Sequence, residues 1–234
     1  MMDRSVSYDR DRTALAASEF VRRVYNWMAL GLAVTAITAL YTVSSPAMLQ
    51  FIFGTPMVLM VLIIGELGLV IAISAAINRI QSSTALLMFF AYAFLNGLTL
   101  SAIFLAYTKA SIANTFFITA GTFAAMSLYG YTTKRDLTSM GSFMMMGLIG
   151  IIIASLVNIF LASPQIYWII TYAGILIFVG LSAYDAQKIK QMAYAGFEGA
   201  EMERKGAVIG ALSLYLDFIN LFLLLLRLFG RRNS

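Results

Sequence analysis

Seven long apolar segments, separated by short polar connections, divide most of the chain. They cover residues 24–43, 57–77, 84–107, 111–132, 138–162, 166–187 and 207–228. Each matches the roughly 20 residues that a helix needs to cross a bilayer. All three prolines, Pro46, Pro56 and Pro164, fall between these segments, as expected for residues at helix boundaries. The pattern predicts an all-α membrane protein, a bundle of seven transmembrane helices.

The two ends of the chain are predicted to lie outside the helical bundle. Residues 1–23 are charged and lack the leading apolar core of a cleaved signal peptide, so we expect a cytosolic tail that is mobile or weakly helical. Residues 24–230 form the predicted transmembrane domain, and residues 231–234 a short C-terminal tail.

Composition narrows the chemistry that such a bundle can perform. Hydrophobic residues make up 61% of the chain, charged residues 12%, and the mean hydropathy is +0.85. The chain has no cysteine and no histidine, which excludes a Ser/His hydrolase, a histidine-ligated metal and a zinc site built on sulfur. The net charge of +5 comes from residues in short loops beside the spans, a pattern of membrane insertion rather than nucleic-acid binding.

The distribution of basic residues predicts the orientation. With the N-terminus in the cytosol, twelve of the sixteen lysines and arginines lie inside. The inside set is Arg4, Arg10, Arg12, Arg22, Arg23, Arg79, Lys134, Arg135, Lys188, Lys190, Arg204 and Lys205. The outside set is Lys109, Arg227, Arg231 and Arg232. This asymmetry favours an N-terminus inside and a C-terminus outside. A six-span arrangement, whose re-entrant last segment returns the C-terminal arginines to the cytosol, is the alternative.

The last apolar stretch, residues 211–230, carries an acid well inside it. Asp217 shares one helical face with Ser213, Asn220 and Arg227. An isolated ionised carboxylate in a bilayer costs at least about 3 kcal/mol, so this face must meet protein or water rather than lipid. An acid in this position is a candidate functional residue.

A second acid, Asp185, lies near the end of the sixth span. Gly196 and Gly199 predict a chain reversal near residue 200, and a hairpin folded at about 201 would bring Asp185 and Asp217 to equal depth on neighbouring helices. Ser182 lies on the same face of the sixth helix as Asp185. Two adjacent carboxylates in a low-dielectric site cannot readily both ionise, so we expect them to share a proton.

The same pair could also bind a cation. Deprotonated carboxylate oxygens suit calcium, although two carboxylates alone leave its coordination incomplete. In a purely structural role the aspartates would instead bond to neighbouring hydroxyls, or pair with Arg79 or Arg227. A third intramembrane acid, Glu66, lies in the middle of the second span without a partner in its own helix.

Four motifs resemble those of the Bax inhibitor family, also called transmembrane Bax-inhibitor-motif proteins. They are FLNGLTLS (94–101), YGYTTKRDLTSMGSF (129–143), FVGLSAYDAQKIK (178–190) and LSLYLDFINLFLLLLRLFG (212–230). The resemblance runs from about residue 20 to residue 230. It implies a helical bundle with the last helix near its centre.

The resemblance also implies a function: a pH-sensitive calcium leak in a bacterial plasma membrane or a eukaryotic internal membrane. The family's proposed pH sensor and gate maps onto Asp185 and Asp217, and its second-helix glutamate onto Glu66. The arginine that competes for the aspartate pair in other members has only Arg79 as a candidate. Arg79 lies at the extreme end of the span, and an apolar residue near Ile77 occupies the family's position.

We therefore expect a multi-pass protein of the bacterial inner membrane that conducts calcium in response to protons, needs no cofactor, binds no nucleic acid and is not an enzyme. An intramembrane aspartyl protease is disfavoured because Asp217 follows Leu-Tyr-Leu rather than Gly-x-Gly. A retinal receptor is disfavoured because it needs a Schiff-base lysine in its last span, and no lysine follows Gly206 in this chain. A regulator that binds another membrane protein, such as a membrane protease or a death-pathway factor, with structural aspartates, stays open.

Overall fold

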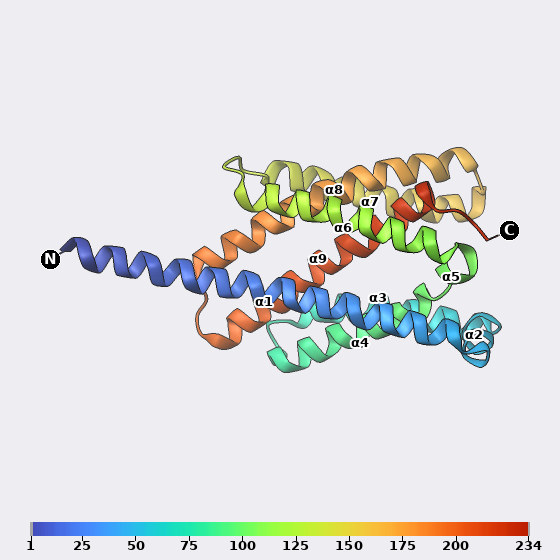
Figure 1. Cartoon of the computed structure of the whole chain (residues 1–234), viewed down its shortest axis with the longest axis horizontal. Coiled ribbons are helices and arrows are strands. Elements are labelled where there is room, and N and C mark those ends of the chain that lie inside the picture. Colours follow the sequence, from blue (N-terminus) through green and yellow to red (C-terminus); the bar gives the residue numbers. More distant parts are fainter. Residues whose placement is uncertain (1, 234) are drawn as a thin grey trace. The chain divides into compact units, whose positions relative to one another are not determined.

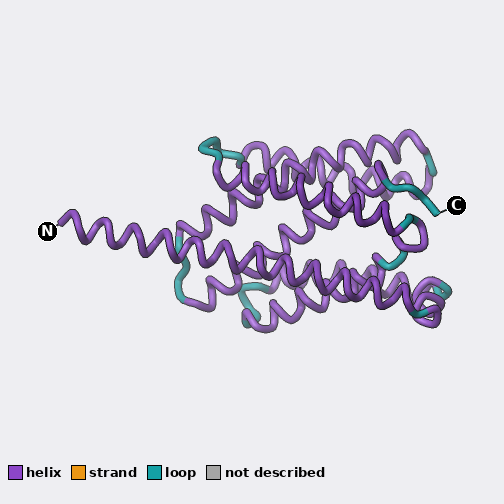
Figure 2. Tube along the Cα trace, viewed as in Figure 1, coloured by secondary structure: helices purple, strands orange, loops and turns teal. Residues whose placement is uncertain are grey.

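The structure is a computed structural model that describes residues 2–233, with side chains from residue 13 onward. The side chains of Arg4, Arg10 and Arg12, and the outermost residues of both predicted tails, lie outside the described part. The chain is 88% helical, and the described residues form no strand beyond an isolated bridge between Tyr107 and Arg232 (Figure 2).

Nine helices make up the described chain (Figure 1). In order they are α1 (Met2–Ser44), α2 (Pro46–Phe53), α3 (Pro56–Ala76), α4 (Ser82–Leu100), α5 (Ile103–Ala106), α6 (Lys109–Thr132), α7 (Thr138–Leu161), α8 (Pro164–Ala195) and α9 (Ala200–Phe229). Prolines begin α2, α3 and α8, where the missing N–H costs no helical hydrogen bond. The boundaries predicted from the prolines are confirmed.

Seven segments are long and apolar enough to cross a membrane, which confirms the predicted number. They are Thr13–Ser44, Pro56–Ala76, Ser82–Ala106, Lys109–Thr132, Thr138–Leu161, Pro164–Ala195 and Ala200–Phe229. In α9, 72% of the apolar window is buried, against 6% in α3. The last helix is thus the most enclosed of the seven, as the family resemblance implied.

Three helices extend well past the apolar stretches that predicted them. The first, α1, includes residues 2–23, which were expected to be mobile or weakly helical. No glycine or proline precedes Gly31, so nothing in the sequence interrupts this helix. Likewise α8 continues through a polar segment to Ala195, and α9 begins at Ala200. Hydropathy marks the membrane-embedded part of a helix and not its ends.

The structure confirms a turn at Gly196 and Gly199 between α8 and α9, but the turn lies earlier in the chain than predicted. Gly196 and Gly199 have φ angles of 74° and 90°, in the left-handed region that favours glycine. Because α9 has already begun at Ala200, the predicted fold point at about residue 201 is a few residues too late.

The chain divides into two compact units, each with segments from both parts of the sequence. The first unit contains residues 2–106 and 189–215. In it α4 packs against both α1 and α3. Gly97 of α4 lies directly against Thr35 and Thr38 of α1, where any side chain at position 97 would collide with them. Close approach at glycine is how helices pack tightly in a membrane.

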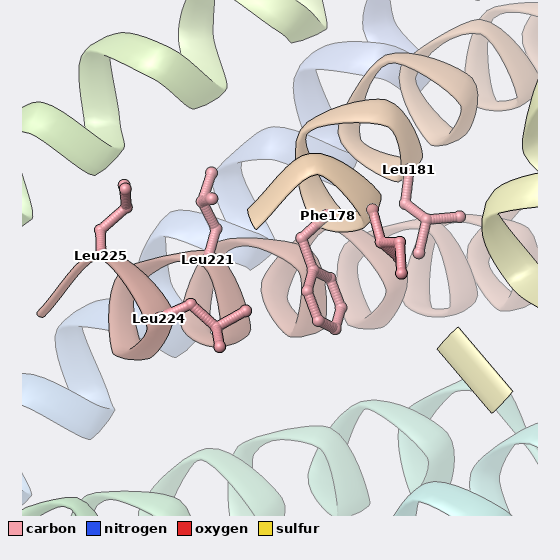
Figure 3. Packing of buried hydrophobic residues seen from close by; sticks show 6 residues of the cluster. Phe178, Leu181, Leu221, Leu224 and Leu225 are labelled. Atoms are coloured by element: carbon pink, nitrogen blue, oxygen red, sulfur yellow. The ribbon is translucent and has the colours of Figure 1, made fainter. Parts of the chain in front are cut away.

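The second unit contains residues 107–188 and 216–233, so α6, α7, most of α8 and the last part of α9 pack together. Its core joins α8 to α9 through Ile177, Phe178, Leu181, Leu221, Leu224 and Leu225 (Figure 3). Gly174 of α8 lies against Leu224, and Gly180 lies against Met144 of α7. Glycines of α8 therefore hold α7 and α9 close to it.

The end of the chain is fixed at the start of α6. The Thr108 N–H donates to the Arg231 carbonyl at 3.0 Å, and the Arg231 N–H donates to Ser111 Oγ at 2.7 Å. Three spans precede the connection before α6, and seven precede the C-terminus. Because both numbers are odd, both segments lie on the same side of the membrane. The six-span alternative would place them on opposite sides, and the structure contradicts it.

Candidate functional site

Asp217 is an enclosed acid on α9, in the second unit. Its side chain is 4% exposed, and its Oδ2 atom has no hydrogen-bond partner among the described residues. The next residue, Phe218, packs edge-on against Phe116 and Phe123 of α6, with ring centroids 5.4 and 5.5 Å apart. These aromatic contacts fix the rotation of α9 that keeps Asp217 inside protein, as its place on the polar face predicted.

Asp185, on α8, belongs to the same unit and is half-buried. It lies close enough to Asp217 for its charge to act on that carboxyl, and the exposed Lys188 acts in turn on Asp185. The structure therefore brings together the two aspartates selected from the sequence. Among the described residues, the Oδ2 atom of Asp217 accepts no hydrogen bond from a hydroxyl.

The residues around Asp185 hold α8 in place. Gly130 of α6 lies directly against the backbone of Ala183, leaving no room for a side chain at 130. Gln187 bonds to the connection between α6 and α7: its Oε1 accepts from the Leu137 N–H and its Nε2 donates to the Arg135 carbonyl, both at 2.8 Å. The backbone on either side of Asp185 is thus fixed by α6 and by the connection that follows it.

Ser127 of α6 is a member of this region that sequence reasoning missed. Its Oγ atom is buried and, like Asp217 Oδ2, has no partner among the described residues. Phe123, one turn before it, contacts Phe218 of α9, and Gly130, one turn after it, contacts Ala183 of α8. Ser127 therefore lies on the face of α6 that meets both aspartate-bearing helices. The sequence does indicate its position, because Ser127 follows Thr115, Thr119 and Phe123 at a spacing of four residues, which places all four on one face of α6.

Two of the predicted supporting residues bond within their own helices. Ser182 Oγ donates to the Phe178 carbonyl and Asn220 Nδ2 to the Leu216 carbonyl, each within its own helix. Arg227 lies over the Tyr167 ring, 5.2 Å from its centroid. Ser213 is half-buried in the part of α9 that belongs to the first unit.

Glu66 has partners on a neighbouring helix of the first unit. Its Oε1 accepts from Thr99 Oγ1 at 2.9 Å, and its Oε2 accepts from Asn96 Nδ2 at 3.2 Å. Asn96 Oδ1 accepts from the Tyr215 hydroxyl at 3.1 Å, and this hydroxyl lies 2.6 Å from Thr35 Oγ1. One hydrogen-bonded network thus joins α3, α4, α9 and α1 inside the apolar region.

Arg79 follows α3 in the first unit. It lines a pocket with Glu201, Arg204 and Lys205. No group of three His, Cys, Asp or Glu side chains able to hold a metal ion occurs in the described part of the chain.

These features define a multi-pass α-helical membrane protein with an enclosed acid, Asp217, and a half-buried one, Asp185, in the same unit. A family model described as "Inhibitor of apoptosis-promoting Bax1" matches residues 17–234. The chain therefore belongs to the Bax inhibitor family, as the motifs indicated.

Three bacterial relatives are similar over nearly their whole length. The Inner membrane protein YbhL of Escherichia coli K12 is 50% identical over 214 residues, covering 91% of this chain and 92% of the relative. An uncharacterized protein of Borreliella burgdorferi is 48% identical, with 94% and 95% covered. An uncharacterized membrane protein of Streptococcus pyogenes is 38% identical, with 92% and 94% covered. The similarity therefore spans the whole helical bundle.

Proposed function

We propose that this protein is a pH-sensitive calcium leak channel, gated by protonation of Asp185 and Asp217. One observation carries the proposal: Asp217 is almost completely enclosed, keeps one carboxylate oxygen without a partner, and lies within range of the Asp185 charge. Ionising a buried carboxyl without a compensating cation costs free energy. Binding a proton removes this charge, and so changes strongly how the Asp217 side chain interacts with its neighbours.

Calcium is the transported ion in this proposal, not a resident cofactor. When both aspartates are deprotonated, their oxygens form a hard site that attracts a divalent cation into the apolar region. When protons bind, the attraction is lost and the two side chains can approach each other. The Lys188 charge beside Asp185 offsets part of the repulsion between the carboxylates.

The proposed setting is the bacterial inner membrane, with the N-terminus in the cytosol. The name of the Escherichia coli relative supports the location. The excess of basic residues in alternate connections supports the orientation. With seven spans the C-terminus then faces away from the cytosol. Fluorescent and phosphatase reporters fused to the C-terminus test this orientation. We expect the phosphatase fusion to be active, whereas a fluorescent fusion would contradict the orientation.

Calcium entry into liposomes that contain the pure protein tests the gate. We expect a flux that varies with pH in the wild type and loses or shifts this dependence in Asp185→Asn and Asp217→Asn. Glu198→Gln is the matched control, since it removes an exposed acid in the α8–α9 connection and should leave the profile unchanged. Unchanged flux in both site variants would overturn the proposed gate and favour the alternative of a regulator that binds other membrane proteins.

A further inference from the structure

A basic pocket in the first unit is not used by the proposed gate. Its cavity volume is about 460 Å³, and it lies where the α3–α4 connection meets the first turns of α9. Three of its lining side chains are cationic, Arg79, Arg204 and Lys205, and one is anionic, Glu201. We call this the α3–α4–α9 pocket.

The single acid of the pocket is already used by the protein. Glu201 Oε1 accepts from the Ser82 N–H at 2.6 Å, and its Oε2 accepts from Ser82 Oγ at 2.7 Å. It thereby caps the N-terminus of α4, where the helix dipole favours a negative charge. Arg204 and Lys205 act on the charge of Glu201, but one negative charge offsets only part of the three positive charges that line the pocket.

None of the three cations is held in a close ion pair. Neither Arg79, Arg204 nor Lys205 forms an ion pair with another side chain in the described part of the chain. Arg79 and Arg204 are exposed, and Lys205 is half-buried. Three positive charges against one negative therefore surround the pocket, an arrangement that attracts a phosphate group.

The position of the pocket along the spans selects the source of that phosphate. The second apolar stretch ends at residue 77, the third begins at residue 84, and the last begins at residue 207, so the three cations lie just outside them. Three span ends at one place mark the level at which the hydrocarbon core gives way to lipid headgroups. Basic pockets between transmembrane helices at this level are suited to anionic headgroups.

We propose that the α3–α4–α9 pocket binds the headgroup phosphate of an anionic phospholipid. Arg79 binds from the α3–α4 connection, and Arg204 and Lys205 from the first two turns of α9. The lipid then links two segments that are far apart in the sequence, and stabilises the junction at which α9 enters the membrane. In the orientation proposed above this is the cytoplasmic leaflet, but the inference does not depend on calcium conduction.

Lipid titration of the full chain in detergent tests this site by native mass spectrometry. Wild-type protein should retain phosphatidylglycerol more tightly than phosphatidylcholine. The variant Arg79→Gln/Arg204→Gln/Lys205→Gln should bind phosphatidylglycerol about tenfold more weakly or worse, as expected from the loss of three cations. The variant Lys134→Gln/Arg135→Gln/Arg232→Gln removes the same charge from exposed positions elsewhere and should bind as the wild type does.

Two outcomes would overturn the proposal. One is equal loss of phosphatidylglycerol in both triple variants, because binding would then follow net charge alone. The other is wild-type binding of inorganic phosphate that depends on the three cations and displaces the lipid, because the natural ligand would then be a free anion.

A crosslinking measurement covers the case in which the triple variant does not fold. Wild-type protein is reconstituted with phosphatidylglycerol that carries a photoreactive headgroup, and the labelled peptides are identified. Labelling within residues 79–83 and 201–205 supports the site. Labelling elsewhere, without these segments, would overturn it.

Discussion

Ser127 and Asp217 each hold a buried side-chain oxygen that no described residue satisfies, and they lie on two helices joined by the contact between Phe123 and Phe218. Leaving a buried polar atom without a partner costs about 1–3 kcal/mol. Two such atoms on adjoining helices of one unit are therefore suited to a small polar ligand, such as a hydrated cation on the proposed calcium path.

This relationship predicts the effect of Ser127→Ala. Losing the oxygen removes one hydrogen bond to the passing ion, which is worth about 1 kcal/mol, so the calcium flux should fall about fivefold at the pH of maximal flux. Thermal stability should change little, because this oxygen has no partner among the described residues. Ser155→Ala is the control, since Ser155 is exposed on α7 and bonds within its own helix. A flux equal to that of the wild type would remove Ser127 from the path.

Gly130→Ala should destabilise the second unit. Its new methyl group would overlap the backbone carbonyl of Ala183, which cannot move aside as a flexible side chain can. Overpacking of this kind costs about 1–3 kcal/mol, more than alanine gains in helix propensity. Thermal unfolding in detergent should show the loss. In the same helix Gly121→Ala meets no atom within 4 Å and should be neutral or stabilising; equal melting temperatures for both variants would contradict the close contact.

Tyr215→Phe should weaken the network that contains Glu66. The variant keeps the ring contacts with Phe89 and Tyr92 but removes the hydroxyl shared by Asn96 and Thr35. Hydrogen bonds between membrane helices contribute about 0.6 kcal/mol on average and up to about 1.7 kcal/mol, so we expect a loss in this range. Tyr41→Phe, at an exposed position of α1, should leave the unfolding free energy unchanged. If both variants melt alike, the network does not contribute to stability.

Asp136 predicts a pH dependence outside the membrane. Its Oδ1 accepts from the Thr138 side chain at 2.6 Å and the Thr138 N–H at 2.9 Å, and these bonds lower the pKa of the Asp136 carboxyl below its ordinary 3.8. A carboxyl whose pKa is lowered by folding stabilises the protein above the unfolded value, and this contribution is lost as the pH falls through the folded pKa.

Comparing wild type with Asp136→Ala checks this linkage. The difference in melting temperature should be constant from neutral pH down to about pH 5 and should shrink below pH 4, toward zero once the carboxyl is protonated in both states. A difference that stays constant to the lowest accessible pH would mean that Asp136 does not act through its charge.

Some glycines within the apolar segments lie directly against a neighbouring helix, and others do not. Gly147, Gly174 and Gly180 lie against Ile177, Leu224 and Met144, as expected for small residues at helix contacts. Gly68 and Gly150, which also lie within apolar segments, have no neighbouring atom within 4 Å of a side chain added there. A glycine marks where close approach is possible, but the partner helix decides whether it occurs.

The sequence by itself determined the class of protein, the number of spans and the two aspartates. Apolar runs about 20 residues long leave few alternatives to transmembrane helices, and an acid inside such a run must be enclosed by protein or water. Tertiary structure alone decided which polar atoms meet. The partners of Glu66 on α4, the capping of α4 by Glu201 and the return of Arg231 to Thr108 all join positions distant in the chain. Such contacts depend on the rotation and register of packed helices, which local periodicity does not specify.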